Sequence, residues 1–136
     1  LGGLIFGIQA KQIGAGKQSI AIDLKSPEGR ALFLRMVPNF DVVAENFKPG
    51  TMDKFGLGYA ELAAVNPSII YASVSGFGNT VESEYKHWPA FAPVVEAMSG
   101  LYEITRRRED PPVISPVGAL GDTGSGLFAV IGAACP

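Results

Sequence analysis

The glycine-rich segment 118–126, GALGDTGSG, holds the residue best suited to covalent chemistry, Asp122. It precedes an apolar run typical of a helix. Glycines let a ligand approach the backbone, and free N–H groups at a helix start favour an ionised carboxylate. Such a carboxylate can attack an acyl carbon. Asp122 is therefore a candidate nucleophile, and the alternative is that it only caps the helix, as aspartates there often do.

A second candidate site is the loop at residues 46–50, NFKPG, directly after an apolar stretch typical of a strand. Open α/β sheets bind ligands at the carboxyl ends of their strands. The flat ring of Phe47 could contact a base, and Lys48 could meet a phosphate. The alternative is that these residues only turn the chain.

The remaining reactive residues do not form recognisable sites. Residues 14–19, GAGKQS, fail the phosphate-loop pattern, because Lys11 replaces its first glycine and Gln18 its hydroxyl residue. His87 is the only histidine and Cys135 the only cysteine, so we expect no metal site and no internal disulfide. A single cysteine is typical of a reducing compartment, and we expect a cytoplasmic protein.

The composition indicates one globular unit. Of 136 residues, 47% are hydrophobic and 18% charged, which excludes a disordered chain. Eleven basic residues against 13 acidic ones give a net charge of -2, which offers no general attraction for nucleic acid or an anionic membrane surface. An anionic partner must be bound by local groups. No apolar run reaches the roughly 20 residues of a membrane span, and we expect no membrane partner.

The elements that must position these residues alternate between strands and helices. We expect strands at residues 19–24, 41–45, 69–75 and 113–117. Helices are expected at 27–37, around 52–55, at 59–65, at 92–102 and after residue 118, with a loop over 79–89. The helix at 27–37 should turn four residues inward: Ala31, Leu32, Leu34 and Met36. This order predicts an α/β fold with a parallel sheet covered by helices on both faces.

Both ends of the chain resemble internal segments of a longer protein. The first residue is Leu1, and the segment after it lacks the basic region and cleavage site of a secretory signal. The final apolar run stops at Pro136 without a polar tail. We therefore expect residues 1–136 to be one partial domain, truncated at both ends.

Several segments, taken in order, resemble the class III coenzyme A transferases, the family of formyl-CoA and carnitine CoA-transferases. Residues 16–25 (GKQSIAIDLK) resemble the family's GKRSIALDLK strand, and residues 41–52 (DVVAENFKPGTM) resemble its DVVVENFRPGTM segment. Residues 57–59 (LGY), 66–67 (NP), 71–78 (YASVSGFG), 97–101 (AMSGL) and 121–122 (GD) follow in the family's order. Each motif alone is weak, but the ordered series is specific, and it covers nearly everything from Gly16 onward.

The resemblance implies a Rossmann-like parallel sheet with flanking helices, here an incomplete large domain of an interlocked homodimer. It implies a transferase that moves CoA between carboxylic acids, with acyl-CoA and free acids as substrates and no tightly bound cofactor. Asp122 maps onto the family's nucleophile, which forms an acyl-aspartyl anhydride and then an aspartyl-CoA thioester. The family's CoA contacts map onto Ile22, Asp23, Leu24, Lys25, Asn46, Phe47, Lys48, Lys54 and Lys86. Lys54 departs from the arginine that is common in the family and loses its bidentate phosphate geometry.

Two other interpretations remain open at this stage. The α-methylacyl-CoA racemases of the same superfamily use a histidine and an aspartate, but those positions hold Phe91 and Ala92 when residues 97–100 are aligned. Alternatively, the chain by itself is an inactive CoA-binding fragment.

Overall fold

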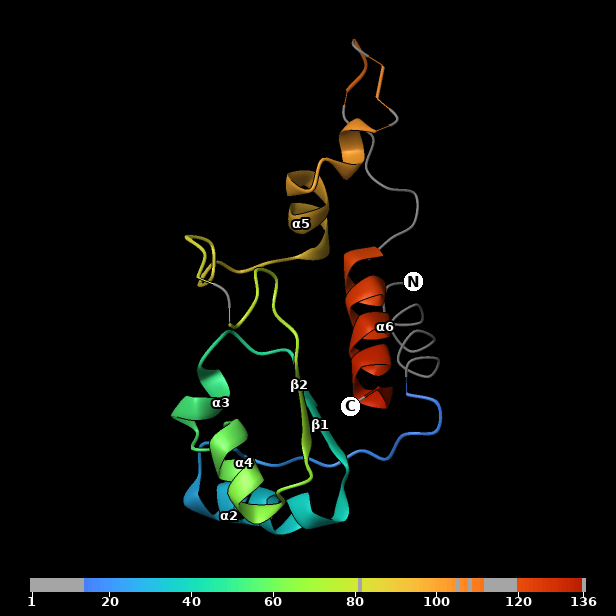
Figure 1. The fold of residues 1–136 in the computed structure, drawn as a ribbon. Helices are drawn as coiled ribbons and strands as arrows, with labels where there is room; N and C mark the ends of the chain where they lie inside the picture. The colour runs from blue at the N-terminus through green and yellow to red at the C-terminus, as the bar shows by residue number, and fades with distance from the viewer. Residues whose placement is uncertain (1–13, 81, 105, 108, 112–119, 136) are drawn as a thin grey trace, which may run out of the picture.

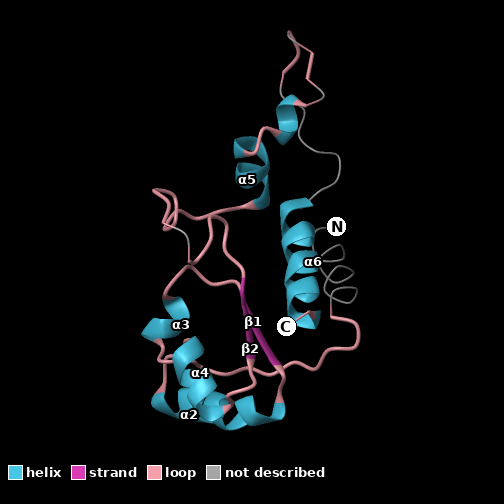
Figure 2. Ribbon diagram, viewed as in Figure 1, coloured by secondary structure: helices cyan, strands magenta, loops and turns pink. Residues whose placement is uncertain are grey.

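The computed structural model describes residues 14–80, 82–104, 106, 107, 109–111 and 120–135. Two short strands stand at the centre, with three helices at one side and a long helix at the other (Figures 1 and 2). In chain order the elements are α2 (Pro27–Met36), η1 (Val37–Asn39), β1 (Val42–Glu45), α3 (Thr51–Lys54), α4 (Tyr59–Val65), β2 (Ile70–Ser73), α5 (Ala92–Met98), η2 (Leu101–Glu103) and α6 (Leu120–Ala134).

The start of α2 follows from two residues. The hydroxyl of Ser26 accepts a hydrogen bond from the Gly29 N–H at 3.0 Å, which satisfies one of the free amides of the first turn. Pro27 occupies the first helical position, where its missing N–H costs nothing. The predicted helix at 27–37 is therefore confirmed, one residue shorter than expected.

The two described strands pair in parallel, as predicted. The register places Val42 opposite Ile70 and Glu45 opposite Ser73. The chain between the strands forms α3 and α4, and α6 contacts β2 from the other side of the sheet (Figure 1). A parallel strand pair with helices on both faces is the predicted α/β arrangement.

The hydrophobic core lies between the sheet and the helices on the α2–α4 side. It consists of five buried residues: Val37, Met52, Leu57, Leu62 and Ile69. Leu24, Phe33, Leu34, Val43, Phe55, Ala63 and Tyr71 pack around them. Burial of this apolar surface holds the strand–helix–strand unit together.

Several expectations about the helices and strands differ from the structure. Residues 19–24 form no strand, because no described segment supplies the hydrogen-bonding partner that a strand requires. Ala31 is exposed rather than inward, since the helix turns Phe33 and Leu34 to the core instead. The predicted strand at 69–75 is confirmed only as Ile70–Ser73.

The helix expected at 92–102 ends at Met98, because Gly100 adopts a left-handed conformation with φ 80°. The strand expected at 113–117 lies outside the described residues.

The last helix, α6, is rich in apolar residues, and several of its large apolar side chains are exposed in this chain. Phe128 is 75% exposed, Val130 66% and Leu127 60%. Within the described residues, no helix combines the length and apolar character that crossing a membrane requires.

Candidate functional site

A cleft of about 1040 Å³ opens where the two strands end. Because the strands are parallel, Glu45 and Ser73 reach the same sheet edge, where ligands bind in folds of this kind. Gly50, with φ 77°, turns the chain from the loop after β1 into α3 at the rim of the cleft. The other polar or charged side chains of its lining are Thr51, Asp53, Tyr59, Tyr71, Ser75, Asn79, Thr80, Lys86, His87 and Ser125.

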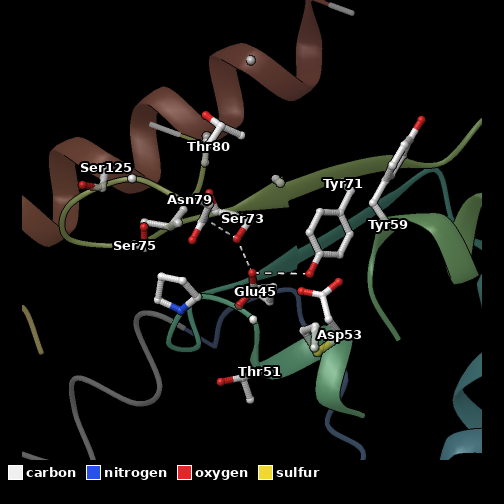
Figure 3. Close-up of a pocket in the computed structure, with 18 of the residues that line it drawn as sticks. Glu45, Thr51, Asp53, Tyr59, Tyr71, Ser73, Ser75, Asn79, Thr80 and Ser125 are labelled. Atoms are coloured by element: carbon white, nitrogen blue, oxygen red, sulfur yellow. Dashed lines mark hydrogen bonds between the residues drawn. The ribbon is translucent and has the colours of Figure 1, made fainter. Parts of the chain in front are cut away.

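A hydrogen-bond network centred on Glu45 joins the two strand ends inside this cleft (Figure 3). Its Oε1 accepts from the hydroxyls of Ser73 and, at 3.4 Å, Tyr71. Its Oε2 accepts from the Phe47 N–H at 2.6 Å. Asn79 Nδ2 donates to Ser73 Oγ at 2.7 Å. The network fixes the strand ends and the loops that leave them.

The environment of Tyr71 keeps its hydroxyl protonated. Burial, then the negative charge of Glu45 and the hydrogen bond to it, then the charge of Asp53, raise the pKa of Tyr71 to about 12. The phenol can therefore act as a hydrogen-bond donor throughout the physiological range.

One further hydroxyl in the cleft has no partner in the described chain. Ser75 Oγ is buried without a hydrogen bond, and such a group is costly unless something satisfies it. Sequence reasoning missed Glu45, Tyr71, Ser73 and Asn79. The available signal was the position of Glu45 at the carboxyl end of a strand, beside a loop already singled out.

Asp122 lies in the first turn of α6. The helix already includes Leu120 and Gly121, so Asp122 follows the helix start rather than capping it. Its side chain is exposed. Ser125, which lines the cleft, is three residues further along α6 and so neighbours Asp122 on the helix surface.

A buried carboxylate from α5 meets this end of α6. Glu96 Oε1 accepts a hydrogen bond from the Gly121 N–H at 3.0 Å. Its Oε2 accepts from the Tyr102 hydroxyl at 2.8 Å. Burial, and then the hydrogen bond to Glu96, raise the pKa of Tyr102 above its usual value.

The predicted contacts at residues 22–25 form the turn before α2. Asp23 Oδ1 accepts from the Lys25 N–H at 3.0 Å, and the Asp23 carbonyl accepts from Ser26 Oγ at 3.0 Å. Leu24 packs against the core, Ile22 is half-buried and Lys25 is exposed. Asp23 thus has a structural role in the turn whatever else it binds.

The other predicted contacts cluster around the loop after β1. Phe47 packs edge-on against Phe55 with ring centroids 6.5 Å apart, which places this loop beside α3, the helix that bears Lys54. Lys48 and Lys54 are exposed. Asn46 lines a smaller cavity between the sheet and α6, of about 370 Å³.

Lys86 lines the main cleft and pairs with Glu82 at 3.1 Å. Of the nine predicted contacts it alone lines that cleft. No group of three or more potential metal-ligating side chains occurs in the part of the chain that the structure describes.

Residues 7–135 match the model of CoA-transferase family III. The acetyl-CoA:oxalate CoA-transferase of Acetobacter aceti is 45% identical over 90% of this chain and 31% of its own length. The succinyl-CoA–D-citramalate CoA-transferase of Chloroflexus aurantiacus is 44% identical over 89% of this chain and 29% of its own length. A CaiB/BaiF family protein from Brucella suis superposes with a TM-score of 0.76 at 37% identity, over 88% of this chain and 31% of that one. The chain thus spans about a third of these proteins, and it belongs to CoA-transferase family III.

Proposed function

We propose that the protein containing this chain transfers coenzyme A between carboxylic acids, with Asp122 as the covalent nucleophile. The observation that carries the proposal is the exposed Asp122 carboxylate in the first turn of α6, in a chain of this family. Two of the matched relatives are named as CoA-transferases, which supports the same class of reaction here.

The reaction balances without an external oxidant, reductant or base. An Asp122 oxygen attacks the thioester carbon of the donor, the C–S bond breaks, and CoA leaves as a thiolate. Asp122 and the donor acyl group are then joined as a mixed anhydride. The thiolate attacks the Asp122 carbonyl carbon, releasing the donor acid as a carboxylate and leaving an aspartyl-CoA thioester. The acceptor carboxylate displaces the thiolate in turn, and the thiolate then attacks the acceptor's acyl carbon. New acyl-CoA leaves, and the Asp122 carboxylate is regenerated.

The surroundings of Asp122 suit this chemistry. Free N–H groups in the first turn of a helix stabilise negative charge that develops on an attacked carbonyl oxygen.

We propose that the CoA contacts are those that the family resemblance assigns. The exposed cations Lys25, Lys48 and Lys54 would meet the phosphates, with Phe47 offering an aromatic surface and Lys86 reaching from the main cleft. The remaining contacts in the proposal are Ile22, Asp23, Leu24 and Asn46. CoA is then a substrate that enters and leaves, rather than a resident cofactor.

A transfer assay on the complete protein tests the proposal. It is incubated with acyl-CoA donors and free acids, and the acyl-CoA products are measured by mass spectrometry. We expect exchange of CoA between acids, and hydroxylamine added during turnover should cleave the covalent intermediate and leave a hydroxamate on Asp122. Deuterium entering the α-carbon without exchange would instead support a racemase, although Phe91 and Ala92 replace the racemase acid–base pair.

We further propose that the chain is part of a large domain whose complete form is an interlocked homodimer. That the chain is only part of a domain is supported by its coverage of two matched relatives, 31% and 29% of their lengths. The homodimer is what the family resemblance implies. The 136-residue chain alone should then lack turnover, whereas the complete protein should sediment as a dimer.

A further inference from the structure

Glu96 is the one buried charged side chain among the residues that the structure describes, and it is 6% exposed. A buried carboxylate is costly unless hydrogen bonds compensate it. Glu96 has such bonds on both oxygens, one from the backbone of Gly121 and one from the Tyr102 hydroxyl. Neither partner belongs to α5, so the carboxylate ties α5 to elements outside its own helix.

The hydrogen bond to Gly121 satisfies a backbone amide in the first turn of α6, which has no partner within the helix. It also joins residues 25 apart in sequence. The two helices approach closely at this point, since a Cβ on Gly121 would lie 3.5 Å from Ala92. Glu96 and the packing of Gly121 on Ala92 therefore fix where α6 begins.

Asp122 is the next residue after Gly121. We propose that Glu96 is a positioning residue, which holds the first turn of α6 through the Gly121 amide and so aims the Asp122 carboxylate at the acyl carbon. Tyr102 holds the second oxygen and keeps the Glu96 side chain from rotating away. The proposal rests on the proposed role of Asp122 as nucleophile.

This role requires a hydrogen-bond acceptor at residue 96 and not a charge. Glu96→Gln keeps an acceptor oxygen for the Gly121 N–H at nearly the same volume, whereas Glu96→Met keeps the volume and removes the acceptor. Ser99→Ala is the matched control, because Ser99 Oγ donates to the Glu96 backbone carbonyl at 2.8 Å within the same segment. That change weakens the end of α5 without touching α6.

The test measures kcat, KM for acyl-CoA and hydrogen exchange in the peptide 120–128 of the complete protein. For Glu96→Met we expect kcat to fall about 10- to 100-fold, the usual cost of a misplaced reacting group, with little change in KM. Exchange at the start of α6 should become faster. Glu96→Gln and Ser99→Ala should stay within about threefold of wild type on all three measurements.

Two results would overturn the proposal. One is a folded Glu96→Met variant with wild-type kcat, and the other is a Glu96→Gln variant as impaired as Glu96→Met. If Glu96→Met does not fold, Tyr102→Phe takes its place, with a several-fold loss of kcat expected and wild-type kcat as the contrary result.

Asp122→Asn, measured in parallel, separates the two proposals. If that variant is inactive while Glu96→Met turns over normally, only the positioning role fails. If Asp122→Asn remains active, the nucleophile assignment fails first.

Discussion

Replacing Asp122 by asparagine separates its chemical role from its structural one. The change removes the nucleophilic oxygen and the charge but keeps nearly the same shape. Asp122 is exposed, and among the described residues its side chain has no hydrogen bond or ion pair. The remaining contribution of Asp122 to stability is the interaction of its negative charge with the amino-terminal end of α6, about 0.3–1 kcal/mol. We therefore expect the free energy of unfolding to fall by no more than about 1 kcal/mol.

The expected loss of turnover is much larger. An amide forms neither the mixed anhydride nor the aspartyl-CoA thioester, so both covalent steps stop. Removing a covalent nucleophile lowers kcat on the order of 10⁴-fold or more in well-studied enzymes. The two effects of one substitution thus differ by several kcal/mol.

Glu28→Gln is the matched control for this experiment. Glu28 is an exposed acid in the first turn of α2, as Asp122 is in the first turn of α6. Removing its charge should cost a similar small amount of stability and leave CoA exchange unchanged. Urea unfolding gives the stability of each variant, and the transfer assay with hydroxylamine trapping gives the chemistry.

An Asp122→Asn variant that retains more than about a tenth of wild-type turnover would refute this reasoning. So would a hydroxamate formed by hydroxylamine on a different carboxylate. A loss of several kcal/mol of stability would show that Asp122 has a structural role that its exposure does not indicate.

Three further predictions follow from contacts outside the nucleophile. The absorbance difference between wild type and Tyr71→Phe should reveal a tyrosine that ionises near pH 12. Because the pKa of Tyr71 is higher in the folded protein than in the unfolded chain, its contribution to stability is present below about pH 10 and is lost as the pH rises through 12. An ionisation midpoint near pH 10 would contradict this prediction. Gly29→Ala should destabilise the protein by about 1–3 kcal/mol in thermal unfolding, because the new methyl group would overlap the Asp23 carbonyl oxygen; helix propensity alone predicts a gain instead. The 136-residue chain should associate in sedimentation experiments through Leu127 and Phe128, 60% and 75% exposed, and lysine at both positions should reduce that association, whereas a monomeric unmodified chain would disprove it.

Local patterns in the sequence predicted much of the fold. Ser26 and Pro27 marked the start of α2, and the limits of α4 at 59–65 came out as predicted. Parallel pairing followed from strands that alternate with helices at short connections. The strand expected at 19–24 failed because β-branched alternation describes a surface suited to a sheet, while a strand also needs a neighbour.

The site was predictable only in part, for a physical reason. Asp122 and the loop after β1 stand in recognisable local patterns, so reasoning from the sequence reached them. The bonds from Glu45 to Ser73 and from Glu96 to Gly121 join residues 28 and 25 apart. Such contacts depend on strand register and helix packing, which composition and periodicity do not encode. Whether the predicted CoA contacts bind CoA stays a prediction.

The position of the hydrophobic core has a consequence for how the protein folds during its synthesis. All five buried residues of the cluster lie between Val37 and Ile69, in one continuous stretch that includes β1, α3 and α4. Contacts between residues near in sequence form fast, since little chain entropy is lost in bringing them together. A chain made from its amino end, at roughly 5–20 residues per second, can therefore fold this unit before α6 has been made. The helix that carries Asp122 then docks onto a preformed sheet, so we expect faults in this late step to yield a folded protein without activity.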